Sequence, residues 1–93
     1  MLIRLPHLIT KTGRKSSSIY ERLANGLLPA PVKSGRSSLW VEAEIDAVLA
    51  TEAAGASDDE IRSLVQELVA ARPLRAREAR EAALGSVASQ HAA

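Results

Sequence analysis

The chain has 93 residues, which is enough for one domain with one modest core. It contains no cysteine, which excludes disulfides and thiolate metal sites, and only one tryptophan and one tyrosine, so aliphatic side chains must fill the core. Its apolar runs are much shorter than the ~20 residues of a membrane span, and its start has no signal-peptide pattern. We therefore expect a soluble, cytoplasmic and mainly helical protein.

The net charge of +1 hides a strong polarity along the chain. Residues 1–40 carry a charge of +6, residues 41–71 a charge of −7, and residues 72–93 a charge of +2. Such a distribution favours a polyanion as partner of the basic end, with the acidic end facing solvent or a basic partner. The alternative is a solvated charge pattern that has no partner.

The first part of the chain has the pattern of two short helices joined by a tight turn. Apolar residues at helical spacing predict a helix over residues 7–12, and Gly13 ends it because glycine accepts a positive φ without strain. A second helix follows, capped by Ser16 or Ser17 and stopped by Asn25-Gly26. Two helices joined by a three- or four-residue turn that contains glycine have the spacing of a helix-turn-helix.

The next segment predicts a β-wing, which is a short hairpin beside the helix-turn-helix. Two prolines at 29 and 31 forbid continued helix, and Val32-Lys33 and residues 39–41 flank a polar run over residues 34–38. A third helix is expected over residues 42–53, with acidic residues in its first turn and one apolar stripe. We assign five apolar residues to the core without a functional role: Leu8, Ile19, Trp40, Ile45 and Leu49.

The clearest periodicity of the chain predicts a fourth helix. The capping-box sequence over residues 57–60 starts it, and its aliphatic stripe consists of Ile61, Leu64, Val65, Leu68 and Val69. This stripe either packs on the domain or pairs with a second copy of the chain, giving a homodimer or a DNA-assisted oligomer. We expect a DNA-binding domain over residues 1–53, this amphipathic helix over residues 57–72, and a flexible tail over residues 73–93 that is at best a frayed helix.

Six short motifs follow one another in residues 4–50. They are Arg4-Leu5-Pro6, Thr12-Gly13, Ser18-Ile19-Tyr20, Gly26-x-x-Pro29, Pro31-Val32-Lys33 and Trp40-x-x-x-Glu44-Ile45-Asp46. In this order and spacing they resemble the AlpA-type regulators of phages and prophages, a family related to excisionases and to MerR-like winged helix-turn-helix domains. The chain departs from the family pattern at Arg14, Glu21, Leu28 and Leu39. The resemblance implies a mainly α fold with a two-stranded β-wing and a function in binding duplex DNA.

In a winged helix-turn-helix the second helix enters the major groove and the wing flanks the backbone. The candidate DNA-binding residues are therefore Arg14, Lys15, Ser16, Ser17, Ser18, Tyr20, Glu21, Arg22, Asn25, Lys33 and Arg36. Among them Arg22 is expected to read guanine, because a guanidinium pairs with that base through two hydrogen bonds. For the serines the alternative is helix capping, and for the arginine it is plain solvation. Arg4 is expected instead to pair with an acid of the third helix.

Enzyme chemistry finds little support in the sequence. His7 and His91 are the only histidines, so a zinc site or a histidine-based nucleophile pair cannot be assembled, and no glycine-rich phosphate loop is present. We expect no metal and no cofactor. Three functions stay open: a sequence-specific transcriptional regulator of the AlpA kind, an excisionase-like factor that bends recombination-site DNA, and an adaptor that binds a protein through the acidic helices of residues 42–71.

Overall fold

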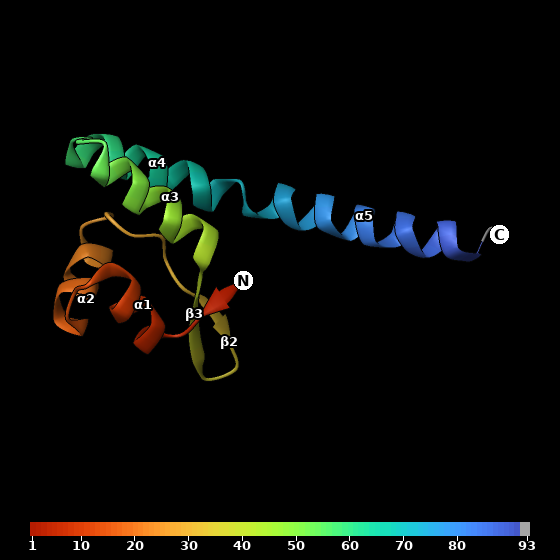
Figure 1. The fold of residues 1–93 in the computed structure, drawn as a ribbon, viewed down its shortest axis with the longest axis horizontal. Coiled ribbons are helices and arrows are strands. Elements are labelled where there is room, and N and C mark those ends of the chain that lie inside the picture. Colours follow the sequence, from red (N-terminus) through yellow and green to blue (C-terminus); the bar gives the residue numbers. More distant parts are fainter. Residues whose placement is uncertain (92–93) are drawn as a thin grey trace.

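The computed structural model describes the backbone of residues 1–91 and the side chains of residues 1–85. Its elements are β1 (Leu2–Ile3), α1 (Leu5–Thr12), α2 (Ser16–Ala24), β2 (Val32–Ser34), β3 (Ser37–Val41), α3 (Glu42–Ala53), α4 (Asp58–Ala70) and α5 (Arg72–His91). Figure 1 shows a small body made of β1 to α4, from which α5 projects as a long arm. The two remaining residues, 92 and 93, lie outside the described part.

The helix-turn-helix forms where the sequence predicts it. Gly13 ends α1 with a φ of +67°, and its N–H donates to the carbonyl oxygen of Ile9 at 2.9 Å. The residue before the first turn of α2 is Lys15, in extended conformation, and no side chain caps this helix. The prediction that Ser16 or Ser17 is the cap is therefore wrong, because both residues already lie inside the first turn, where their own backbone is helical.

The predicted hairpin is present, but it belongs to a larger sheet. Antiparallel β2 and β3 are joined by two residues, of which Gly35 comes first with a φ of +61°, the sign that a type II′ turn requires at that position. On its other edge β3 pairs with β1, in the register Leu2 to Val41 and Ile3 to Trp40. The expected two-stranded sheet is thus a three-stranded one in the described chain, with the order β1-β3-β2. A strand of two residues is too short to show an alternating pattern, so only its partner defines it.

One core holds the body together. It contains Ile3, Leu8, Ile19, Leu27, Leu28, Trp40, Ile45, Val48, Ile61 and Val65. The core positions predicted for Leu8, Ile19, Trp40 and Ile45 are confirmed, whereas Leu49 is partly buried against the core. Because these side chains come from β1 to α4, the helix-turn-helix and the hairpin are fixed to one another by a common apolar interior.

Helix α4 closes this core instead of presenting a free stripe. Its cap is the predicted one, since Ser57 Oγ accepts a hydrogen bond from the N–H of Glu60 at 3.2 Å. Ile61 and Val65 are buried, while Leu64 and Leu68 pack against the core at its edge. Of the two alternatives for the stripe, packing on the domain is the one observed. Pairing of this stripe with a second copy of the chain stays a prediction.

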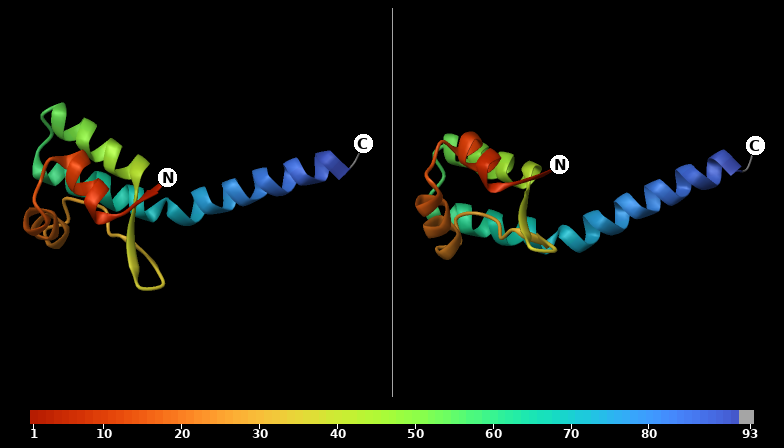
Figure 2. Two further views of the ribbon diagram at one scale, coloured as in Figure 1. Left: turned by 60° about the horizontal axis from the view of Figure 1, so that its bottom comes forward. Right: turned by 90° about the horizontal axis from the view of Figure 1, so that it is seen from below.

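Helix α5 differs from the expected tail. Residues 73–91, where the sequence predicted at best a frayed helix, continue as one helix that leaves the body beside α4 (Figure 2). Pro73 does not prevent this, because proline lacks an N–H that the first turn of a helix leaves unpaired anyway. The flexibility of this segment stays a prediction. None of the described helices is both long enough and apolar enough to cross a membrane.

Candidate nucleic-acid interface

Helix α2 presents a continuous polar face to solvent. Ser16, Ser17, Tyr20 and Glu21 are exposed and recur at helical spacing, while Ile19 on the opposite side is fully buried. The tyrosine is an unusual member of this face, because 56% of a large aromatic residue is open to solvent. Burial of Ile19 thus fixes the rotation of α2 and decides which of the predicted residues point outward.

Arg22 does not belong to that outward face. Its guanidinium pairs with the carboxylate of Glu52 on α3, and only 16% of its side chain is exposed. Arg14, in the turn before α2, has its Nη2 3.8 Å from the same carboxylate. The structure therefore assigns both arginines to a contact between the helix-turn-helix and α3, which sequence reasoning missed because thirty residues separate Arg22 from Glu52. This position does not fit the expected reading of guanine by Arg22.

The remaining helix residues of the predicted set are divided. Ser18 is half-buried and Asn25 is exposed. The backbone of Asn25 is also held, since its carbonyl oxygen accepts a hydrogen bond from Arg62 Nε at 2.8 Å. At the start of α2, Lys15 is exposed, and the N–H groups of the first turn face no capping side chain.

The hairpin carries two further cations. Lys33 and Arg36 are both exposed, and Lys33 Nζ donates to Ser38 Oγ across the strands at 2.8 Å. In Figure 1 the hairpin and α2 project away from α3 and α4. Lys15 of the turn and the two hairpin cations are therefore exposed, whereas Arg14 is half-buried beside Glu52.

The acids of α3 are matched by cations of the first helices. Lys11 Nζ lies 2.7 Å from Asp46, and His7 Nε2 lies 3.7 Å from Glu42. The hydrogen bond to Asp46 raises the pKa of Lys11 above its ordinary value, so this lysine stays charged. Within residues 1–85 Arg4 does not form the expected ion pair, and α1 places Lys11 and His7 beside these acids instead. Among residues 1–85, three cations of the candidate interface have no acidic partner: Lys15, Lys33 and Arg36.

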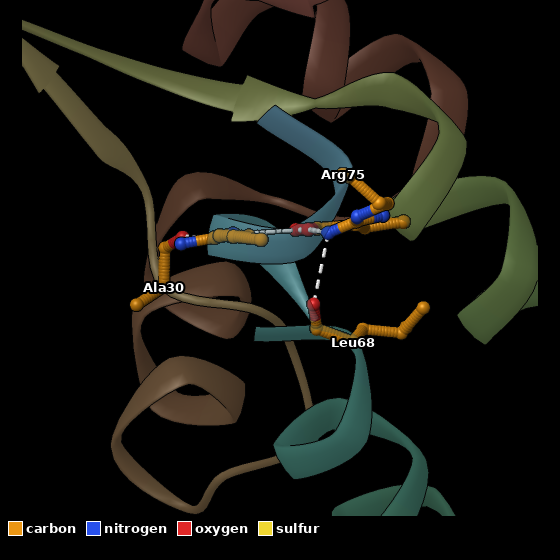
Figure 3. A network of polar contacts seen from close by, with 5 residues as sticks. Ala30, Leu68 and Arg75 are labelled. Carbon is orange, nitrogen blue, oxygen red and sulfur yellow. Dashed lines mark hydrogen bonds and ion pairs between the residues drawn. The ribbon is translucent and has the colours of Figure 1, made fainter. Parts of the chain in front are cut away.

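A buried carboxylate fastens the start of α5 to the body. Glu44 of α3 is fully buried, and both of its oxygens accept hydrogen bonds from Arg72, at 2.6 and 2.9 Å. Arg75 donates to the same carboxylate, and the two arginines also reach the carbonyl oxygens of Ala30 and Leu68 (Figure 3). Burial alone would raise the pKa of Glu44, but hydrogen bonds from the two guanidinium groups lower it below its ordinary value. The network links α3, α5 and the segment that leads into the hairpin.

Sequence reasoning missed this network as well. In the sequence Glu44 is an acid in the first turn of a helix, where the helix dipole accounts for it, and a member of the last family motif. The one sequence feature that points to burial of Glu44 is its position next to the core residue Ile45. Two adjacent helical residues can both be buried when a second helix, here α4, covers one side of the helix. Residues 1–85 contain no group of acids and histidines that could hold a metal ion and no pocket.

A short helix-turn-helix, followed by a hairpin and a third helix on one core, defines a small domain of the helix-turn-helix class. Residues 1–52 match the family model described as the prophage CP4-57 regulatory protein (AlpA). The chain therefore belongs to the AlpA family of prophage regulatory proteins, and the resemblance seen in residues 4–50 is confirmed. No curated protein and no solved structure matches the chain.

Proposed function

We propose that this protein is a transcriptional regulator of prophage type that binds duplex DNA at specific sequences. The observation that carries the proposal is the exposed polar face of α2, together with three exposed cations, Lys15, Lys33 and Arg36, that pair with no acid within residues 1–85. Membership of a regulatory family supports it. Such a regulator acts in the cytoplasm, where a bacterial chromosome lies.

In the proposed complex α2 enters the major groove with its exposed face toward the bases. Glu21 accepts a hydrogen bond from the amino group of cytosine, and Tyr20 contacts a thymine methyl group or a phosphate. Ser16, Ser17 and the free N–H groups of the first turn bind a phosphate, which the positive end of the helix dipole favours. Asn25 is at the far end of the same helix and is the least central of these contacts.

The hairpin acts as a wing in this proposal. Lys33 and Arg36 lie on the phosphate backbone or in the adjacent minor groove, where they add affinity for any sequence. Arg14 and Arg22 serve differently, because their shared partner Glu52 holds α2 at its angle to α3. They position the reading helix without contacting the bases.

The test begins with selection of bound duplexes from a random pool by the full chain, followed by titration of the selected site at several salt concentrations. Glu21→Gln should change the preferred base at one position of the site, because an amide also donates hydrogen bonds. Arg36→Ala should weaken all duplexes similarly and reduce the salt slope by about one unit. Arg80→Ala, which removes an exposed arginine from α5, is the matched control and should leave binding unchanged.

Two results would contradict the proposal. One is the recovery of no preferred sequence together with binding that does not weaken as salt increases. The other is an unchanged base preference in both Glu21→Gln and Tyr20→Ala while the variants stay folded, because α2 would then not face the bases.

A further inference from the structure

Helix α5 is an arm whose described side chains beyond the first turn are all exposed. Arg72 and Arg75 tie its start to Glu44, but the residues from Ala76 to Gly85 are all exposed. Two large apolar side chains stand in the open, Leu74 at 50% and Leu84 at 61% exposure. In proteins most of the stability of a helix comes from the packing of one face and not from the helix alone. The arm is therefore a surface to which a partner can add.

Four side chains of the arm share one face. Leu74, Arg77, Glu81 and Leu84 follow one another at spacings of three, four and three residues, the spacing of a helix–helix seam. On this face a leucine stands at each end, and an arginine and a glutamate stand between them. The face combines two apolar contacts with two opposite charges.

This face is complementary to itself only in one orientation. When a second α5 is laid antiparallel about Ala79, Leu74 meets Leu84 of the other copy and Arg77 meets Glu81, and each contact occurs twice by symmetry. When the copies are parallel and in register, Arg77 meets Arg77 and Glu81 meets Glu81, which is repulsive. Charge complementarity therefore selects an antiparallel copy of the same chain.

We propose that α5 pairs with α5 of a second copy of this protein through Leu74, Arg77, Glu81 and Leu84, in antiparallel orientation. The pairing does not depend on DNA binding, because it uses none of the proposed DNA contacts. Two leucine contacts and two partly solvated ion pairs give a weak interface, which strengthens when two copies are held close together. The antiparallel arrangement places the two helix-turn-helix bodies at opposite ends of the paired helices.

The first experiment measures self-association of the full chain by sedimentation equilibrium, without DNA, up to the highest soluble concentration. Arg77→Glu and Glu81→Arg should each weaken association about tenfold, because each leaves only like charges in the seam. An equal mixture of the two variants should recover association, since every contact then joins opposite charges. Ala83→Glu, which adds an acid on the opposite side of the helix, is the control and should associate like the wild type. Circular dichroism verifies that each variant keeps its helix content.

The second experiment determines orientation and uses the absence of native cysteine. A mixture of Leu74→Cys and Leu84→Cys chains should form the mixed disulfide on mild oxidation, while each variant alone should form little. The two like positions lie ~15 Å apart along an antiparallel pair, which is beyond the reach of a disulfide. The proposal would be overturned if the wild type sediments as a monomer at every concentration and the mixture of Leu74→Cys and Leu84→Cys chains gives no mixed disulfide. A mixture of charge variants that associates no better than its components, or preferential disulfides between like positions, would overturn it equally.

Discussion

Replacing Glu44 by glutamine tests whether the buried carboxylate is what fastens α5 to the body. The carboxylate accepts three hydrogen bonds from two guanidinium groups, and such charge-assisted bonds contribute about 1.5–3 kcal/mol each. Glutamine keeps one acceptor oxygen but turns an N–H group toward a cation. The loss stays below the full sum, because the side chains of Arg72 and Arg75 are 23% and 40% exposed and regain water. We expect a loss of about 2–4 kcal/mol in the free energy of unfolding.

Urea denaturation followed by circular dichroism measures this loss, and the melting temperature should decrease by roughly 10–20 °C. Asp46→Asn on the same helix is the matched control. Its ion pair with Lys11 is mostly in solvent, with the aspartate side chain 54% exposed, so it should cost less than about 1 kcal/mol. A Glu44→Gln variant no less stable than Asp46→Asn would refute the reasoning.

The difference in unfolding free energy between the wild type and Glu44→Gln should depend on pH. The pKa of Glu44 in the folded protein is lowered from its ordinary value of 4.5, so the carboxylate contributes its full stability above that value. This contribution is lost as the pH falls through the lowered pKa of the folded state. Glu44 of the wild type is then protonated and neutral, like the glutamine of the variant. The stability difference between wild type and Glu44→Gln should thus be constant at neutral and mildly acidic pH and shrink in stronger acid. A difference that does not change with pH would mean that the charge of Glu44 is not responsible.

Two further predictions concern the helix-turn-helix. Arg22→Ala should lower the free energy of unfolding by about 1–2 kcal/mol, a value between those of surface and buried ion pairs. It should leave the base preference of the folded protein unchanged. A changed preference in the random-duplex selection would mean that Arg22 contacts the bases. Gly13→Ala should cost about 1–2 kcal/mol in urea denaturation, because alanine is strained at a φ of +67° although its Cβ would meet no atom within 4 Å. Gly85→Ala, inside exposed α5, is its control and should be neutral or slightly stabilising, and equal effects at both glycines would contradict the strain argument.

Local features of the sequence were sufficient for the order and type of most elements. Gly13 and Gly26 mark the ends of α1 and α2 because both sit at positive φ, which other residues avoid, and a helix end of this kind needs no distant partner. The cap of α4 is likewise local, since Ser57 and Glu60 are three residues apart. Such signals depend on backbone conformation and nearest neighbours. Some of them, such as the two glycines, are also part of the family motifs in residues 4–50.

The tertiary structure alone decided which polar side chains remain free for a partner. Arg22 and Glu52 are thirty residues apart, and Glu44 lies at a similar distance in sequence from its two arginines. A charged residue looks the same in the sequence whether it is exposed or paired with a distant residue. Its role can therefore be assigned only when the tertiary structure gives its neighbours. The strand β1 follows the same rule, because two residues become a strand only when β3 supplies their hydrogen bonds. Local chemistry thus determined where the elements lie, whereas the pairing of distant charges, which requires a closed core, determined which charged residues remain exposed.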